Sequence, residues 1–214
     1  MNFDFIAPYY DRLAHGVFGD LLAQSRRVLL SRLPEAKEVL ILGGGSGDML
    51  FGLAERSIGK HIRYVEASAK FIALAQSAWQ NQAVYADIKI DWIQTTWQDF
   101  DSSLQFDLIT TDYLLDLFPP AELELLICKI AAQLKPEGSW LYIDFCQHEK
   151  TAWWWAPLRF IMYRFFARVA GVPGRKITNV RAIASQYGLQ LSHQQTLAQN
   201  GIEAIIFKRQ SKTT

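Results

Sequence analysis

Three alternating glycines and a later acid form the pattern in this sequence that is best suited to chemistry. Gly43, Gly45 and Gly47 directly follow the apolar run 39–42, and Glu66 stands 19 residues after Gly47 at the end of the next apolar run. Glycine lacks a Cβ, so backbone N–H groups in such a turn can approach a ligand closely, and the N-terminus of a following helix favours ligand oxygens. A carboxylate at Glu66 can accept hydrogen bonds from both hydroxyl groups of a ribose. The pattern predicts a site for a nucleoside cofactor.

Two kinds of nucleoside cofactor fit a glycine turn followed by an acid: a nicotinamide dinucleotide and S-adenosylmethionine. The dinucleotide fingerprint G-x-G-x-x-G needs a small third residue for close packing of helix and strand. In this sequence that third position falls on Asp48 or on Leu50. Asp48 would also repel a pyrophosphate, whereas a sulfonium amino acid carries no phosphate. The spacing G-x-G-x-G therefore favours S-adenosylmethionine.

The elements that must position these residues alternate between strand and helix. Apolar spacing predicts strands at 39–42, 62–66, 89–95, 106–111 and 139–145, and helices at 20–33, 48–56, 68–80 and about 120–134. Residues 135–138 (Lys-Pro-Glu-Gly) are typical of a turn. A helix at 178–187 and strands near 189–197 and 202–208 follow, and Asn200-Gly201 favours a tight hairpin between the last two strands. This order predicts an α/β fold with a doubly wound, mostly parallel sheet.

Composition indicates one globular domain. The chain has 214 residues, half of them hydrophobic and a fifth charged, with a formal net charge of +1. That charge gives no general attraction to nucleic acid or to an anionic membrane. Cys128 and Cys146 have no metal-ligand spacing, so we expect two reduced, buried thiols and no metal site. The first five residues lack the basic start and long apolar core of a signal peptide, so we expect a cytoplasmic protein.

Several motifs, in order along the chain, resemble those of class I S-adenosylmethionine-dependent methyltransferases, nearest to the ubiquinone/menaquinone-biosynthesis type. They are the opening Phe3-Asp4-Phe5-Ile6-Ala7-Pro8-Tyr9-Tyr10-Asp11, the loop 42–47, Glu66, the fourth strand Phe106-Asp107-Leu108-Ile109, the turn 134–138 and Gly201-Ile202-Glu203-Ala204. The resemblance covers most of the chain. It implies a single methyltransferase domain over 1–214, with a Rossmann-like seven-stranded sheet whose last strand runs antiparallel. It also implies an N-terminal helical lid at 1–33 and an aromatic insertion at 150–176.

The resemblance further implies which residues touch the cofactor. Gly43, Gly45 and Gly47 would pass beneath the methionine part, Glu66 would hold the ribose, Asp112 would lie near the methionine amino group, and Tyr10 would close over the site.

Two positions depart from the family's pattern. Ile41 stands where most members carry an acid in the first strand, and Thr95-Thr96-Trp97 stands where members often have Gly-Asp-Ala. Thr96 can accept one hydrogen bond from the adenine amino group, but without charge. Trp97 can stack on the adenine or shield it, and Asp99 is a nearby substitute for the missing acid. We therefore expect weaker adenine anchoring here than in the family.

Methyl transfer to a hydroxyl group needs a residue that removes its proton. The candidate bases are Asp116, four residues after Asp112, His148, which follows strand 139–145, and His15 in the predicted lid. Each has a structural alternative. Asp116 would serve equally well as a cap for the helix that begins near Pro119-Pro120, and either histidine would be unremarkable as an exposed side chain.

Residues 152–170 are dense in aromatic side chains, among them Trp153-Trp154-Trp155. They either extend the core or form an apolar chamber over a lipophilic ring such as a quinol. Arg159, Arg164 and Arg168 interrupt the segment and argue against a membrane-spanning helix. Peripheral docking at a membrane surface through 152–170 is an open alternative.

Our leading prediction is methyl transfer from S-adenosylmethionine to a small, lipophilic or aromatic acceptor. The alternative is a non-catalytic binding or assembly protein that keeps the methyltransferase fold and presents the tryptophans to a partner. The missing third glycine disfavours a nicotinamide oxidoreductase. Nucleic acid is not expected as a substrate, because Thr111-Asp112-Tyr113-Leu114 follows the fourth strand in place of an Asn-Pro-Pro-Tyr motif and no basic stripe is present.

Overall fold

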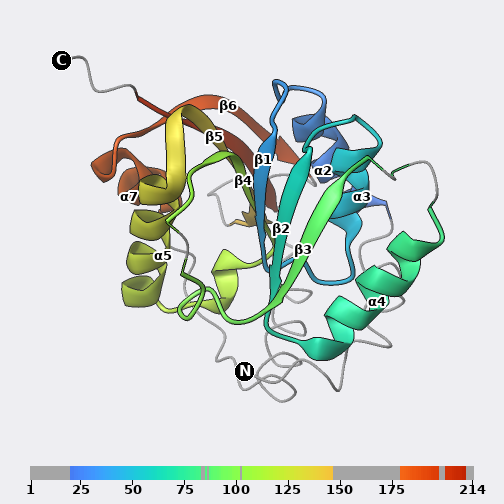
Figure 1. The fold of residues 1–214 in the computed structure, drawn as a ribbon. Coiled ribbons are helices and arrows are strands. Elements are labelled where there is room, and N and C mark those ends of the chain that lie inside the picture. Colours follow the sequence, from blue (N-terminus) through green and yellow to red (C-terminus); the bar gives the residue numbers. More distant parts are fainter. Residues whose placement is uncertain are drawn as a thin grey trace.

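The described residues form one seven-stranded sheet between two layers of helices (Figure 1). The computed structural model describes residues 20–82, 85, 87–101, 103–146, 179–197 and 201–210. The strands are β1 (Glu38–Leu42), β2 (His61–Glu66), β3 (Lys89–Gln94), β4 (Phe106–Asp112), β5 (Leu134–Phe145), β6 (Leu189–Leu197) and β7 (Ile202–Arg209). The helices are α2 (Leu21–Leu30), α3 (Asp48–Ala54), α4 (Ala69–Gln80), α5 (Pro120–Gln133) and α7 (Val180–Gln186), with a 3-10 turn η2 (Leu115–Leu117).

The strand order is β3-β2-β1-β4-β5-β7-β6. Strands β1 to β5 pair in parallel, and β7 runs antiparallel to both β5 and β6. The order reverses beside β1, which lies between β2 and β4, and a doubly wound sheet opens a ligand crevice at the carboxyl ends of its strands at such a point. The predicted α/β sheet with an antiparallel terminal hairpin is confirmed.

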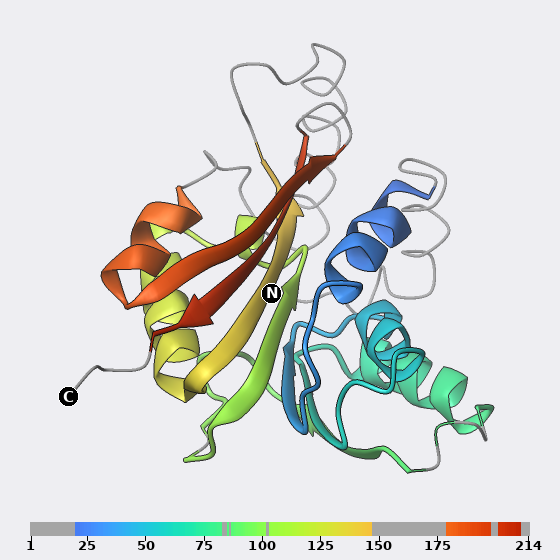
Figure 2. The same cartoon turned by 90° about the horizontal axis from the view of Figure 1, so that it is seen from above.

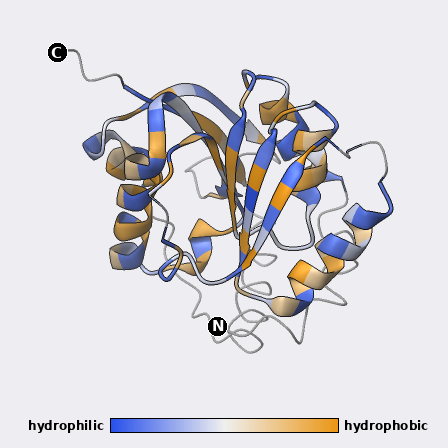
Figure 3. Ribbon diagram, viewed as in Figure 1, coloured by the Kyte–Doolittle hydropathy of each residue, from blue (hydrophilic) through white to orange (hydrophobic). Residues whose placement is uncertain are grey.

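Alternating side chains along β1 contribute to two separate cores. Val39 and Ile41 belong to the core against α2, α3 and α4, while Leu40 and Leu42 belong to the core against α5 and α7. Both faces of a parallel strand are buried by such helices, so its sequence reads as a continuous apolar run. Figure 2 shows the two helical layers on opposite sides of the sheet. Hydrophobic and hydrophilic residues alternate around the helices (Figure 3), which lets one side of each pack on the sheet while the other meets water.

Three sequence expectations differ from the structure in detail. Residues 135–138, predicted as a turn, belong to β5, where the register with β4 shifts and Glu137 adopts a φ of 61°. A bulge of this kind absorbs extra residues within a strand. Helix α2 ends at Leu30, short of the predicted residue 33. Cys128 and Cys146 are both free, but Cys128 is exposed.

The predicted lid (1–33) is described only from residue 20, and the predicted aromatic insertion (150–176) lies outside the described residues. Within the described ranges, no helix is long and apolar enough to cross a membrane. Membrane docking through 152–170 and a cytoplasmic location both stay predictions.

Candidate functional site

A pocket of about 230 Å³ opens at the carboxyl ends of β1 to β5. Its lining includes seven of the predicted site residues, Gly43, Gly45, Glu66, Thr96, Trp97, Asp112 and Asp116. Gly47 does not line this pocket. Tyr10, His15 and His148 lie outside the described residues. The crevice expected from the sheet topology therefore brings together most of the site residues that the sequence predicts.

Gly45 and Gly47 have different roles in the glycine loop. Gly45 has a φ of +59°, and a Cβ added there would meet no atom within 4 Å, so it borders open pocket space. Gly47 has a φ of +105° and forms the N-cap of α3, where an added Cβ would lie 3.3 Å from Ala75 and from Phe51. Gly47 is therefore needed for the turn into the helix, whereas Gly45 leaves room for a ligand.

Glu66 fixes the shape of this loop from the end of β2. One carboxylate oxygen accepts the Gly45 N–H at 3.0 Å, and the other accepts the Ser68 N–H at 2.9 Å. The Tyr64 hydroxyl donates to the Gly45 carbonyl at 2.7 Å. A carboxylate can accept roughly four hydrogen bonds, so support of the loop is compatible with a contact to a ribose.

Arg26 on α2 joins two acids at the rim of the pocket. Its Nε donates to Asp112 Oδ2 at 2.6 Å and its Nη1 donates to Asp48 Oδ2 at 2.8 Å. Burial raises the pKa of Asp112, and the nearby guanidinium only partly opposes this. The second oxygen of Asp112 is buried and has no hydrogen-bond partner among the described residues. An ammonium group bound in the pocket would supply the missing donor.

The segment after β3 forms a single helical turn on the far side of the pocket. The Thr96 hydroxyl donates to Asp99 Oδ2 at 2.8 Å, and the Phe100 N–H donates to the Thr96 carbonyl at 2.9 Å. The hydroxyl predicted to accept an adenine amino group is thus engaged in its own turn. Trp97 is 9% exposed and packs edge-on against Phe118, with ring centroids 5.8 Å apart. Trp97 supplies a wall to the pocket on this side.

Comparisons with known proteins show what the chain resembles. Residues 39–138 match a family model described as a methyltransferase domain. This match, together with the seven-stranded fold, supports the predicted class, the S-adenosylmethionine-dependent methyltransferases, and S-adenosylmethionine as its cofactor. No curated protein matches the chain.

Solved structures share the fold of this chain at low sequence identity. The N-methyltransferase NodS from Bradyrhizobium japonicum WM9 is 16% identical, with a TM-score of 0.64 over 90% of this chain and 99% of NodS. NodS in complex with S-adenosyl-L-homocysteine is 17% identical, with a TM-score of 0.64 over 89% and 88% of the two chains. An O-methyltransferase family protein from Burkholderia thailandensis is 16% identical, with a TM-score of 0.67 over 89% of this chain and 57% of that one.

Asp116 lies in η2, at the pocket wall that follows β4. The predicted alternative, a helix cap, is wrong: α5 has Pro119 as its N-cap and no side chain caps it. Burial raises the pKa of Asp116 to about 7. Asp144, 1% exposed at the end of β5, accepts the Leu115 N–H at 2.8 Å and the Asp116 N–H at 3.2 Å.

The two carboxyl groups titrate as a pair. Burial, together with the charge of Asp116, raises the pKa of Asp144 well above its ordinary value. Two acids so placed cannot both ionise easily, so the pair retains a proton at neutral pH. A carboxylate whose pKa lies near the working pH is well suited to act as a general base.

Arg26 and Asp144 are functional candidates that sequence reasoning missed. Nothing in the pattern of α2 distinguishes Arg26 from its neighbour Arg27, because the partners of Arg26 lie far away in the sequence. Asp144 did carry a signal, as the one acid in the otherwise apolar run 140–145. An acid in a buried strand needs hydrogen-bond donors, and the first N–H groups of η2 supply them.

Proposed function

We propose that this pocket holds S-adenosylmethionine between the glycine loop and Trp97, and that the chain methylates a small, lipophilic or aromatic acceptor. The observation that carries the proposal is the convergence of Gly45, Glu66, Asp112 and Asp116 on one pocket at the switch point of the sheet. Gly45 leaves open space for the methionine part, Glu66 stands where ribose hydroxyl groups can be accepted, and the unpartnered oxygen of Asp112 suits an ammonium group.

The charge of the pocket supports a cationic cofactor. Among the described residues, four acids (Asp48, Glu66, Asp112 and Asp116) and one base, Arg26, line it. When bound, S-adenosylmethionine supplies an electrophilic methyl carbon on a positively charged sulfur. Fixed carboxylates stabilise such a charge more strongly in a cavity shielded from water than they would in bulk solvent.

The acceptor side is proposed from the apolar residues around Asp116. Leu114, Leu117, Phe118 and Phe145 line this part of the pocket, and such surfaces favour a lipophilic ring. Asp116 would take the proton of a hydroxyl acceptor as the oxygen lone pair forms its bond to the methyl carbon and the carbon–sulfur bond breaks. The raised pKa of Asp116, about 7, suits that task.

Calorimetric titration with S-adenosylmethionine, S-adenosylhomocysteine and NADH tests the cofactor assignment. Micromolar binding of the first two, with none of NADH, is expected. Incubation with quinol-like and phenolic acceptors should then release S-adenosylhomocysteine. Absence of binding by both adenosyl compounds would refute the proposal and favour a non-catalytic assembly protein. Binding without turnover on any aromatic acceptor would refute the acceptor class alone.

A further inference from the structure

The turn that carries Trp97 is built so that it needs support at its carboxyl end. At the start of the turn, the Thr96 hydroxyl accepts the Asp99 N–H at 3.2 Å, so one of the first backbone N–H groups of the turn has a partner. A single helical turn leaves its last carbonyl groups without partners of its own. Here those carbonyl groups belong to Trp97, Gln98 and Phe100, and all three face α5.

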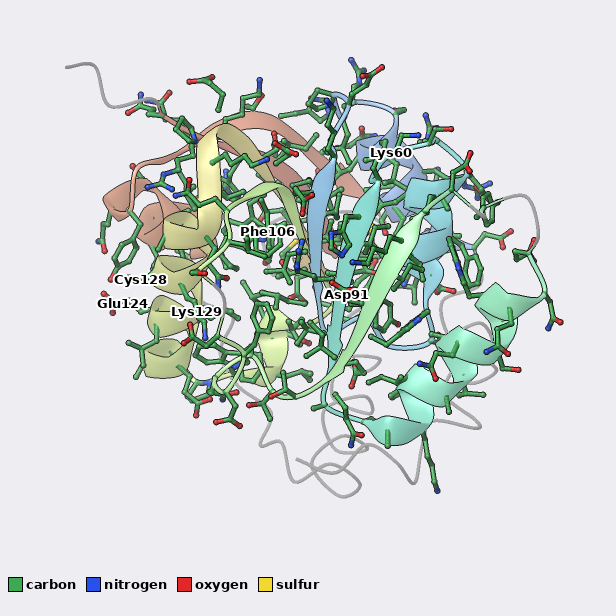
Figure 4. All side chains as sticks on the ribbon, viewed as in Figure 1. Lys60, Asp91, Phe106, Glu124, Cys128 and Lys129 are labelled. Atoms are coloured by element: carbon green, nitrogen blue, oxygen red, sulfur yellow. The ribbon has the colours of Figure 1, made fainter. Side chains whose placement is uncertain are left out.

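Lys129 supplies that support. Its Nζ donates to the carbonyl oxygens of Trp97 at 3.0 Å and of Gln98 at 3.3 Å, and also to that of Phe100. A lysine ammonium has three N–H donors, so this side chain satisfies its full hydrogen-bonding capacity on one turn. Lys129 projects from α5 (Figure 4) and is half-buried, whereas its neighbour Cys128 is exposed.

We propose that Lys129 is a positioning residue that holds residues 96–100 as the wall of the cofactor pocket beside the adenine. The inference rests on the proposed function for its consequence, although the hydrogen bonds themselves do not depend on it. Because the Thr96 hydroxyl is engaged within the turn, recognition of the adenine depends on the fixed position of the turn and of Trp97. In place of the acid that family members often carry here, this chain has the turn at 96–100, which Lys129 holds from α5.

The acceptor side of the pocket has a separate support. Asp144 holds the backbone of Leu115 and Asp116 from β5 and makes no hydrogen bond to the turn at 96–100. Loss of Lys129 should therefore loosen the cofactor wall, while the backbone of Leu115 and Asp116 keeps its support from Asp144. This separation gives the proposal a signature that a general loss of stability would not produce.

Lys129→Met tests the proposal, because methionine keeps an unbranched apolar stem and cannot donate. We expect the Kd for S-adenosylmethionine to rise about tenfold, equivalent to about 1.4 kcal/mol. The kcat at saturating cofactor should change by less than about twofold, since Asp144 still holds the backbone of Asp116. Lys129→Arg keeps N–H donors and should restore most of the affinity. Lys135→Met is the matched control, because Lys135 donates to Asp107 at 2.8 Å, away from the pocket lining.

Hydrogen exchange separates this proposal from the function on which it rests. In Lys129→Met the amide groups of residues 96–100 should exchange at least about threefold faster, with the core strands unchanged. If the wild-type protein binds no adenosyl compound, the proposed function fails, and exchange still decides whether Lys129 holds the turn. Unchanged exchange in a folded variant would overturn the proposal. Faster exchange with an unchanged cofactor Kd in a binding protein would overturn it too, since the turn would then not matter to the cofactor.

Discussion

At the scale of single residues, Asp116 is the side chain whose environment departs most from that of an ordinary aspartate in the pocket. An exposed aspartate is a weak base at neutral pH, because its pKa is about 3.9. Burial raises the pKa of Asp116 to about 7, and Asp144 holds its backbone N–H from below. Burial gives this position a proton affinity that its residue type alone does not predict.

Asp116→Asn should lower kcat by a factor of about 100 or more on a hydroxyl acceptor, because the amide cannot take a proton. The Kd for S-adenosylmethionine should change much less. In the wild-type protein, kcat should rise with pH with a midpoint near 7, and that limb should disappear in the variant. Asp101→Asn, at an exposed position outside the pocket lining, is the control. Equal activity of the two variants would exclude Asp116 as the base.

Gly45→Asn should weaken S-adenosylmethionine binding by at least about tenfold, because its side chain would enter open pocket space while asparagine tolerates a positive φ. Gly188 offers a matched control. Its φ is +74° and an added Cβ would also meet nothing within 4 Å, but it lies between α7 and β6, outside the pocket lining. Gly188→Asn should leave the cofactor Kd unchanged. If calorimetry gives the same Kd for both folded variants, Gly45 does not border the cofactor.

At the scale of helices and strands, sequence periodicity predicts what depends on neighbours along the chain and misses what depends on contacts across the fold. The run 39–42 and the glycines after it lead to β1 and α3 because buried strands and tight turns have local signatures. The bulge at 135–138 depends on the register between β4 and β5, which no local pattern contains. For the same reason the glycine loop was predicted, while Arg26 and Lys129, which reach the site from other helices, were not.

Helix α2 contacts the pocket lining through Arg26 and through Ser25, whose hydroxyl lies 2.9 Å from that of Tyr113, and the Arg26 contact gives a prediction about the helix. Arg26→Gln should lower the free energy of unfolding by about 3 kcal/mol, because it leaves Asp112 buried without its cation. Arg27→Gln, at the exposed adjacent position, should cost less than about 0.5 kcal/mol. Urea unfolding measures both. Adding Asp112→Asn to Arg26→Gln should recover part of the loss, and strictly additive effects would argue against coupling between the two side chains.

At the scale of the whole molecule, the acids at the two ends of the parallel strands have different partners. At the edge away from the pocket, acids have basic partners: His61 Nε2 lies 2.6 Å from Asp91 Oδ2, and Lys135 Nζ lies 2.8 Å from Asp107 Oδ1. Asp91 is marked in Figure 4. At the pocket edge, the part of the chain that the structure describes places one arginine beside four acids. A chain with a net charge of only +1 therefore concentrates negative charge where a cationic ligand would bind.

That asymmetry predicts how stability depends on pH. The pKa values of Asp112, Asp116 and Asp144 are raised in the folded state, chiefly by burial. The folded state thus holds more protons than the unfolded chain, and stability falls as pH rises. For Asp116 this stability is fully present below its unfolded pKa, 3.8, and is lost as pH rises through about 7. Asp107 acts in the opposite sense: burial would raise its pKa, but hydrogen bonds from Glu38 N–H, Lys135 and Lys37 N–H lower it, so its contribution is lost only in acid.

We therefore expect Tm to fall by several degrees between pH 5.5 and pH 8, since about 1 kcal/mol corresponds to about 2–4 °C in a chain of this size. Asp116→Asn cannot ionise, so its Tm should fall less over the same interval and exceed that of the wild type at pH 8. Scanning calorimetry at the two pH values measures both effects. S-Adenosylmethionine should raise Tm more at pH 8 than at pH 5.5, because ionised carboxylates attract its sulfonium, while S-adenosylhomocysteine should show a smaller dependence. A variant that follows the wild-type slope, or equal shifts from the two compounds at both pH values, would contradict an electrostatic role for the acids of the pocket.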